Sequence, residues 1–530
     1  MNDLVIRING LKIGIEDKDC LGTLDKLVRK KLRTDSIDSV KIVKESIDAR
    51  HKPEIFRVYT VDVSVHNPEK TLAKSKCRNA VIYKRPEYVW PEGGPSEYRP
   101  VIIGMGPAGL FCGYMLAMAG CRPIICDRGK CIEDRRKDVS RFWETGALDT
   151  ESNVQFGEGG AGTFSDGKLN TLVNDKNGRN GKVLEIFVQN GAPEEILYKS
   201  KPHIGTDVLA DVVVSMREHI IQKGGEFKYG CKLVSVENSG QLSKAVFEDG
   251  SKIITDSLVL AIGHSARDTF RVLHESGVPM SNKAFAVGLR VIHPQKMINE
   301  AMYGLNTAAE IIGAAPYKLT YKASSGRGVY SFCNCPGGYV VNASSEEGRT
   351  AVNGMSYSKR DGDYANSGII VTVTPDDYGS DDVLAGMEFQ RELEAKAYRL
   401  GQGDIPVQSY PAYRDRYVDE TDPEYDAFKG RIRFTDMSDL LPGELRDAFI
   451  EGMEGFDKVI PGFASNKALL AGIESRTSSP VRIERGNDGR STYGAVYPCG
   501  EGAGYAGGIT SAAMDGIYIA EEIWKKHLTR

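Results

Sequence analysis

Three glycines and one aspartate stand at the spacing of a dinucleotide-binding site. Gly104, Gly106 and Gly109 directly follow the apolar run 101–103, and Asp127 closes a second apolar run about 20 positions further on. In a βαβ unit such glycines permit a tight turn, close approach of the backbone to a pyrophosphate, and close packing of the helix, whose N-terminus faces the phosphates. The pattern therefore predicts a bound dinucleotide, with Asp127 bonding a ribose hydroxyl and repelling a 2′-phosphate.

The same glycine spacing recurs twice without this context. The second match begins at Gly157 and the third at Gly502. Neither follows a strand, opens a helix and has an acidic residue about 20 positions on, which is the context that makes the motif specific. Taken alone, these two matches predict glycine-rich turns.

The elements that must position these residues fall into several segments. The 530 residues are too many for one ordinary core, so we expect two or three domains. The predicted fold class is α/β: a discontinuous Rossmann-like nucleotide-binding domain with an inserted β-rich α+β substrate domain and a small N-terminal α/β module. The predicted segments are the N-terminal module (1–88), a proline- and glycine-rich linker (89–100), the nucleotide-binding domain (101–285 and 461–530) and the substrate domain (286–460).

The formal net charge of −4 is unevenly spread. Residues 1–90 carry 19 of the 68 basic residues and 13 of the 72 acidic ones, a local net charge of +6. A predicted amphipathic helix at 21–33 has one basic face, which is either a solvated surface or a surface for nucleic acid or another partner. We favour the solvated face and do not expect nucleic acid to bind.

Ten cysteines are spread along the chain without a C-x-x-C pair. This argues against a disulfide scaffold or a zinc ribbon, and we predict no metal site. The N-terminal sequence lacks a basic segment followed by an apolar run, and no uninterrupted apolar stretch reaches membrane-spanning length. We therefore expect a soluble, cytoplasmic protein with no membrane partner.

Two cofactor-type segments far apart in the sequence favour FAD over NAD. A nicotinamide dehydrogenase normally keeps its cofactor site in one continuous half of the chain, but here a second glycine-rich helix start stands at 500–510. This segment resembles the C-terminal motif of glutathione-reductase-type flavoproteins. The resemblance places Glu501, where Asp is more usual, at the ribityl chain, and Gly508 and Ile509 at a helix start that points toward the flavin. A helix N-terminus carries about half a positive charge and stabilises an anionic reduced flavin.

Further motifs extend the resemblance over essentially the whole chain. The segments 138–169, 261–268, 333–339 and 474–483 resemble those of a bacterial family of uncharacterised FAD-dependent dehydrogenases. The resemblance implies FAD and a redox role but names no substrate. It also implies that the glycine-rich loop from Gly159 lies near the isoalloxazine and that Val234 reaches the adenine. The predicted FAD-binding residues are Gly104, Gly106, Pro107, Ala108, Gly109, Asp127, Arg128, Gly159, Gly160, Ala161, Gly162, Thr163, Val234, Gly263, Glu501, Gly508 and Ile509.

Several side chains are candidates for chemistry beside the flavin. Lys168 follows the flavin loop, where a cation would stabilise reduced flavin. Arg476 offers a fork that matches a carboxylate or another anionic substrate, as do Arg290 and others. His293 and His264 have the unperturbed pKa needed to move protons near neutrality. For each of them the alternative is a structural hydrogen bond or ion pair.

Cys333 and Cys335 form the nearest approach to a redox pair. They are either a flavin-linked dithiol, a source of one attacking thiolate, or two small residues at a turn or strand end. A C-x-C pair is awkward for a disulfide, and Pro336 favours an extended backbone at Cys335.

The leading hypothesis is an FAD-dependent oxidoreductase, a dehydrogenase that passes a hydride through flavin N5 to or from a small anionic or unsaturated organic substrate. No second glycine fingerprint for NAD(P)H is visible, so the electron donor is left as either NAD(P)H or a protein. The alternatives are a flavoprotein that binds or modifies RNA through the basic N-terminal module, and a non-catalytic flavin-binding redox sensor.

Overall fold

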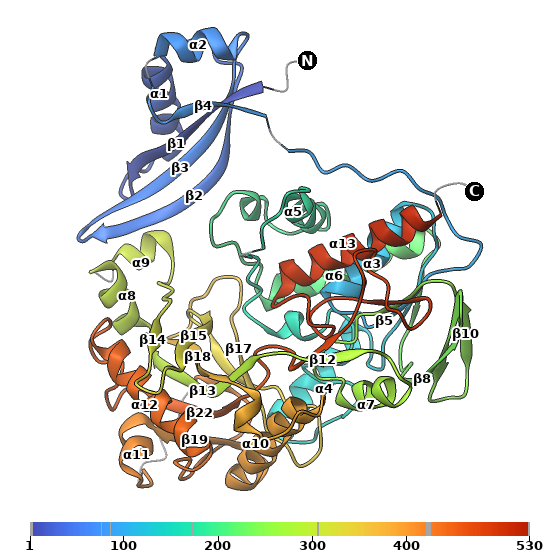
Figure 1. The fold of residues 1–530 in the computed structure, drawn as a ribbon. Coiled ribbons are helices and arrows are strands. Elements are labelled where there is room, and N and C mark those ends of the chain that lie inside the picture. Colours follow the sequence, from blue (N-terminus) through green and yellow to red (C-terminus); the bar gives the residue numbers. More distant parts are fainter. Residues whose placement is uncertain are drawn as a thin grey trace.

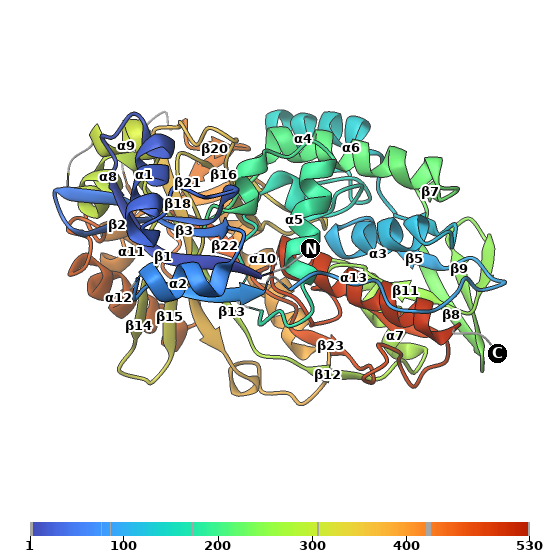
Figure 2. The same ribbon diagram turned by 90° about the horizontal axis from the view of Figure 1, so that it is seen from above.

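The computed structural model describes residues 4–75, 77–84, 86–171, 173–304, 307–419 and 426–527. These form a mixed α/β architecture with several sheets (Figure 1). An N-terminal module lies beside a larger body and contacts it, and in that body a parallel sheet and a larger, mainly antiparallel sheet lie side by side (Figures 1 and 2).

The N-terminal module is an antiparallel sheet with the strand order β2-β3-β1-β4. Its apolar side chains alternate along the strands, and those on one face pack with two helices into a separate core. Its elements are β1 (Leu4–Gly14), α1 (Cys20–Leu32), β2 (Ser39–His51), β3 (Glu54–Ser64), α2 (Pro68–Ser75) and β4 (Ala80–Lys84).

Residues 86–100, which include the predicted linker, lie against the last helix of the chain. Trp90 packs on Trp524 with ring centroids 6.1 Å apart, and the indole of Trp524 donates to the carbonyl of Pro91 at 3.0 Å. A second contact holds the module itself: Glu45 in β2 exchanges backbone hydrogen bonds with Tyr198 and Ser200 of the body. Ring contacts and hydrogen bonds therefore hold the segment 86–100 against the last helix, and backbone hydrogen bonds hold the module against the body.

The predicted βαβ unit is present at the centre of a five-stranded parallel sheet, with the order β24-β11-β5-β6-β7. Successive residues of β5 point into two different cores, Ile102 toward α3 and its neighbours Val101 and Ile103 toward the opposite face. Both faces are covered, which explains why these strands are apolar throughout. The elements are β5 (Val101–Ile103), α3 (Pro107–Met118), β6 (Ile124–Cys126), β7 (Glu226–Lys228), β11 (Leu258–Leu260) and β24 (Val496–Pro498).

Helices and a small antiparallel sheet cover these two faces. α13 and α6 pack on α3, and α5 packs on α13. The remaining elements of this part are α4 (Ile132–Thr145), α5 (Arg179–Gln189), α6 (Thr206–Gln222), β8 (Leu233–Ser239), β9 (Leu242–Phe247), β10 (Lys252–Thr255), α7 (Arg267–Glu275) and α13 (Ile509–Lys526), with short 3₁₀ helices at Ala161–Phe164 and Glu194–Leu197.

A seven-stranded sheet forms the other half of the body, with the order β14-β15-β18-β13-β22-β19-β21. It includes β22, which lies beyond the predicted domain boundary at residue 460, and so the chain re-enters this sheet before it returns to the parallel one. The strands are β13 (Phe285–Pro294), β14 (Thr320–Lys322), β15 (Gly328–Cys335), β18 (Tyr364–Val373), β19 (Ile405–Ser409), β21 (Ile432–Phe434) and β22 (Leu469–Glu474).

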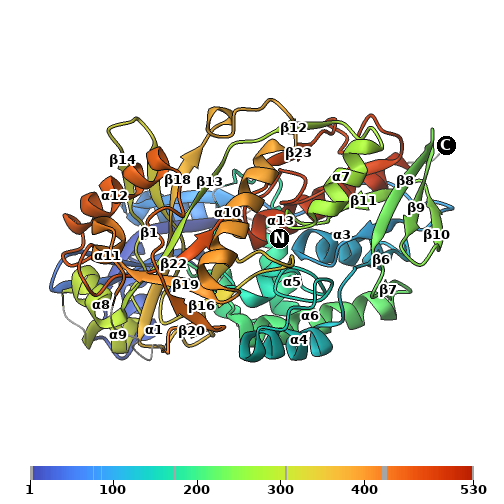
Figure 3. The same ribbon diagram turned by 90° about the horizontal axis from the view of Figure 1, so that it is seen from below.

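Helices and a three-stranded sheet complete this half, whereas a two-stranded sheet of residues 280–282 and 481–483 packs with the core of the parallel sheet. α10 and α7 meet on the underside of the molecule (Figure 3), where Arg271 pairs with Glu388. The elements are β12 (Met280–Asn282), α8 (Gln295–Tyr303), α9 (Thr307–Ile312), β16 (Tyr339–Asn342), β17 (Val352–Met355), α10 (Ala385–Gly401), α11 (Tyr410–Asp415), β20 (Phe428–Lys429), α12 (Gly443–Asp457) and β23 (Val481–Ile483), with a 3₁₀ turn at Pro375–Asp377. Among the described residues, no helix has the length and apolar content needed to cross a membrane.

Candidate functional site

A cavity of about 380 Å³ lies between the parallel sheet and the seven-stranded sheet. Its walls come from the loops after β5, β6, β11 and β24 on one side, and from β15, β17 and the end of β22 on the other. The C-terminal ends of parallel strands are where α/β sheets bind ligands. Within the described residues, no three His, Cys, Asp or Glu side chains are grouped as a metal site requires.

Because the glycines of the dinucleotide motif have no side chains, the backbone itself borders this cavity. Gly104 has φ +107°, and a Cβ there would lie 2.2 Å from the carbonyl oxygen of Ala261. A Cβ on Gly109 would lie 1.9 Å from the carbonyl oxygen of Gly104, so the helix packs too closely for any side chain. A Cβ on Gly160 would meet the Cα of Gly106 at 2.8 Å, because the two glycine-rich segments cross here. The cradle therefore has the shape that a pyrophosphate and a flat ring require.

Asp127, which was predicted to bond a ribose hydroxyl, also holds the turn after β5. Its carboxylate accepts from the backbone N–H of Met105 at 2.9 Å and from that of Gly129 at 2.8 Å, and the side chain also lines the cavity. Each carboxylate oxygen retains a lone pair, so a ribose hydroxyl remains a compatible third partner. Arg128 lines the same end, where it pairs with Asp268 at 2.7 Å and lies 4.5 Å above the ring of Phe156.

Most of the remaining predicted FAD-binding residues also line the cavity. They are Gly104, Gly106, Pro107, Ala108, Gly160, Ala161, Gly162, Gly263, Glu501, Gly508 and Ile509. Gly109, Gly159, Thr163 and Val234 are not among the lining residues, although Leu233, the neighbour of Val234, is. Gly109 acts through helix packing, and Gly159, with φ +85°, shapes the loop that carries its neighbours.

Arg135 holds this loop and was not predicted from the sequence. Its fully buried guanidinium donates to carbonyl oxygens of residues 153, 154, 157, 158 and 160, at distances from 2.6 to 3.4 Å. Burial lowers its pKa to about 10, so it keeps its charge at neutral pH. The residue sits in an ordinary charged helix, and nothing in that pattern indicates that its partners are backbone carbonyls.

Lys168 lines the cavity beside the loop 160–162. Its ammonium donates to the carbonyl of Asn334 and lies 3.6 Å from Asp166. Burial disfavours the cation, but Asp166 and then Cys333 outweigh burial and raise the pKa of Lys168. A permanent positive charge therefore stands in the wall of the cavity.

Cys333 also lines the cavity, and Cys335 is fully buried behind it. The hydrogen bond to Cys335 lowers the pKa of the Cys333 thiol to about 5, aided by Lys168 and Arg290 against the effect of burial. The pKa of Cys335 moves the opposite way, raised by burial and then by Cys333.

His264 and Glu501 meet across the cavity wall. The Nδ1 atom of His264 lies 2.9 Å from the carboxylate of Glu501. The Nε2 atom is buried and has no partner among the described residues, although the side chain lines the cavity. A buried nitrogen of this kind requires a hydrogen-bonding group from a ligand or a water.

His293 is separate from this group. It does not line the cavity, and its Nε2 contacts the carbonyl of Phe463 at 2.8 Å. Burial lowers its pKa to about 4, so the imidazole is neutral at pH 7. The predicted proton transfer by His293 finds no geometric support in this placement.

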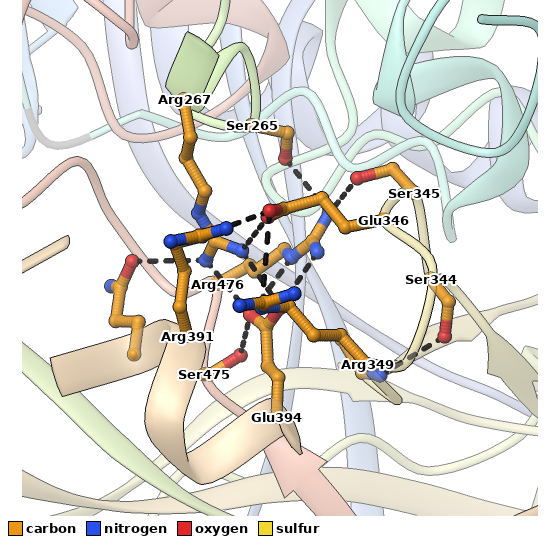
Figure 4. Close-up of polar contacts among 12 residues, drawn as sticks. Ser265, Arg267, Ser344, Ser345, Glu346, Arg349, Arg391, Glu394, Ser475 and Arg476 are labelled. Atoms are coloured by element: carbon orange, nitrogen blue, oxygen red, sulfur yellow. Dashed lines mark hydrogen bonds and ion pairs between the residues drawn. The ribbon is translucent and has the colours of Figure 1, made fainter. Parts of the chain in front are cut away.

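Arg476 lines the cavity, but its guanidinium is fully engaged in a buried ion-pair cluster (Figure 4). It donates to both oxygens of Glu394, at 3.0 and 2.8 Å, and to the hydroxyls of Ser345 and Ser265. Arg267 binds the same carboxylate at 2.7 and 2.8 Å. An anionic substrate would therefore compete with Glu394 for Arg476.

The cluster joins the two halves of the body beneath the cavity. Glu394 comes from α10, Arg267 from α7, and Arg476 from the segment after β22 (Figure 4). Burial opposes ionisation of Glu394, but Arg267 and Arg476 outweigh it and hold the pKa of the carboxyl well below its usual range.

Matches to known protein families support a nucleotide-binding role for the cavity. A family model described as "FAD-dependent protein, C-terminal domain-like" matches residues 284–477, and a domain of unknown function matches residues 5–64. Together with the glycine-lined cradle for a dinucleotide, this match defines an FAD-binding protein, and FAD is its cofactor.

The chain is 43% identical over 532 residues to a protein of Clostridium beijerinckii described as "Uncharacterized protein", with 99% of each chain covered. It belongs to the same family as that protein.

Three solved structures resemble the chain only distantly. Tetracycline destructase Tet(51) is 11% identical with a TM-score of 0.33, over 81% of this chain and 82% of that one. CtdE in complex with FAD is 11% identical with a TM-score of 0.32, over 82% and 87%. Halogenase PltM in complex with phloroglucinol and FAD is 10% identical with a TM-score of 0.37, over 80% and 67%. Scores this low do not establish a shared fold.

Proposed function

We propose that the protein is an FAD-dependent oxidoreductase that performs two-electron chemistry on a small organic substrate. The observation that carries this is the convergence at one cavity of the dinucleotide turn, the loop 160–162, the N-terminus of α13 and a buried cation. When bound, FAD supplies two-electron transfer through N5 of its flavin ring.

The residues of this chain supply the surroundings of that ring. A Cβ on Gly162 would lie 3.1 Å from the Ile509 side chain. The loop 160–162 therefore packs directly against the start of α13. The positive end of α13 and the ammonium of Lys168 both favour negative charge in the cavity. This arrangement stabilises a reduced, anionic flavin.

We propose that the substrate is anionic. Lys201 lies near three other cations: Arg360, Lys168 and Lys318. Burial, followed by repulsion from these cations, lowers the pKa of Lys201. Asp166 offsets the charges of Arg360 and Lys168 in part, and an anion would relieve the remaining repulsion.

The first test is spectroscopic. We expect the purified protein to show a flavin absorption spectrum, and anaerobic addition of NADH or NADPH to bleach it if a pyridine nucleotide is the electron donor. A flavin spectrum that does not bleach would assign the donor to a protein or to the substrate itself. A protein that binds no flavin even after incubation with FAD would contradict the proposal.

A further inference from the structure

The backbone at Cys333 departs from the strand that carries it. The pairing of β15 with β18 shifts register between Phe332 and Cys335, and Cys333 has φ +46°, in the left-handed region that residues other than glycine rarely adopt. Strained backbone of this kind concentrates at functional sites. A regular extended C-x-C segment is awkward for sulfur contact, but here the chain folds back so that the Cys335 thiol donates to the carbonyl oxygen of Cys333 at 3.3 Å.

Two cationic side chains contact the segment that carries these thiols. Arg290 donates to the carbonyl of Cys333 at 3.1 and 3.2 Å, and its Nη1 lies 3.7 Å from the Sγ of Cys335. Lys168 donates to the carbonyl of Asn334, between the two cysteines. Arg290 is itself fully buried and paired with Glu474 at 2.8 Å, so its position is fixed.

These charges contribute to different pKa values for the two thiols. The low pKa of Cys333 and the raised pKa of Cys335 leave one thiolate and one thiol at neutral pH. The thiolate is the one that faces the cavity, whereas Cys335 is completely buried.

We propose that Cys333 and Cys335 form a redox-active dithiol that exchanges two electrons with bound FAD. The proposal rests on the proposed function, because it requires the flavin. In the oxidative direction a Sγ–Sγ bond forms and the S–H bond of Cys335 breaks. The dithiol is oxidised, FAD is reduced, and both electrons and the one proton pass to FAD, so no further reactant is needed. The reverse reaction restores the thiolate and the thiol.

A second cysteine pair provides the matched control. Cys126 and Cys231 are likewise neighbours, and Cys231 lines the cavity, but near Asp127. The nearest cation to that pair, Lys228, is paired with Glu226 at 2.8 Å, and neither cysteine has a positive φ. Cys231→Ser therefore removes a cavity thiol without touching the proposed dithiol.

The experiment is an anaerobic titration of fully oxidised holoprotein with dithionite, with electrons counted per bound flavin. A flavin and a disulfide each take up two electrons, so we expect about four in the wild type and in Cys231→Ser, and about two in Cys333→Ser and in the variant that also carries Cys335→Ser. Mass spectrometry after alkylation of the denatured, oxidised wild type gives a second readout that needs no variant to fold. We expect Cys333 and Cys335 to resist alkylation until a reductant is added.

The outcomes separate the two proposals. Flavin-bound wild type that takes up only two electrons, with both cysteines alkylated, would overturn the dithiol and leave the proposed function standing. The dithiol would also be overturned if Cys231→Ser, but not Cys333→Ser, lost two electrons. A protein that binds no FAD would overturn the proposed function and the dithiol exchange together.

Discussion

At the scale of single residues, the flavin loop depends on one arginine. Arg135 donates to five backbone carbonyls of this loop, of which those of Gly157 and Gly160 also accept from backbone N–H groups. Buried carbonyls left unpaired cost about 1–3 kcal/mol each before the loop relaxes. The conformation of the loop is therefore linked to this side chain as well as to the hydrogen bonds within the loop.

We expect Arg135→Ala to lower the free energy of unfolding by about 3 kcal/mol or more and to abolish stable FAD binding, since the loop loses its hydrogen-bond donors. Urea denaturation and the fraction of flavin retained on gel filtration measure the two effects. Arg136→Ala is the control, because Arg136 is the exposed neighbour on the same helix. Equal flavin retention in both variants would show that the loop does not need Arg135.

At the scale of elements, the two halves of the body are joined through a buried carboxylate. Glu394 on α10 receives two bidentate arginines, one at the start of α7 and one after β22 (Figure 4). Removal of one partner of a buried ion pair leaves the other charge uncompensated, which typically costs 3–5 kcal/mol. The cavity wall that contains Arg476 is thus positioned by α10.

We expect Glu394→Gln to reduce stability by about 3 kcal/mol at pH 7, because the buried Arg476 loses its counter-charge and Arg267 keeps only Glu346. The pKa of Glu394 in the folded protein is depressed, so the stabilisation is fully present above the unfolded value of 4.5 and is lost as pH falls through the folded value. The difference between wild type and variant should therefore stay constant from pH 8 to pH 5 and narrow only at lower pH.

Urea denaturation across this pH range measures the difference, and Glu392→Gln on the exposed face of α10 is the control. A gap that already closes between pH 7 and pH 5 would mean that another group carries the effect.

At the scale of the whole molecule, the N-terminal module is tied to the body at several places, including hydrogen bonds from Lys52 and Arg57 to backbone carbonyls of residues 301 and 311. Two others are the contact of β2 with residues 198–200 and the segment 86–100 along α13 (Figures 1 and 2). The module is basic, but its hydrogen bonds to the body show that it is docked, which gives it a fixed orientation relative to the cavity. Its role as an RNA-binding surface remains a prediction.

We expect Trp524→Ala to expose the segment 86–100 to protease, because the side chain supplies both the ring contact with Trp90 and the hydrogen bond to Pro91. Limited proteolysis followed by mass spectrometry should show cleavage in this segment several-fold faster than in the wild type. Lys525→Ala, a change in an exposed side chain next to Trp524, should leave the rate unchanged. Equal cleavage in the tryptophan variant would show that the segment is held elsewhere.

The sequence by itself determined the features that depend on local spacing. The turn at Gly104, the helix α3 and the start of α13 follow from apolar runs and glycine positions, because the constraint acts within a few residues. Most of the predicted FAD-binding residues therefore line one cavity although they lie nearly the length of the chain apart.

Only the tertiary structure decided which side chains became partners. Arg476 was a candidate substrate clamp, but a helix more than 80 residues away supplies the carboxylate that engages it. The burial of His293 and the carbonyl partners of Arg135 likewise depend on long-range packing. The left-handed backbone at Cys333 arises from a register shift between two strands. Such partners depend on which elements pack together in the folded protein, and the residue types alone do not indicate that packing.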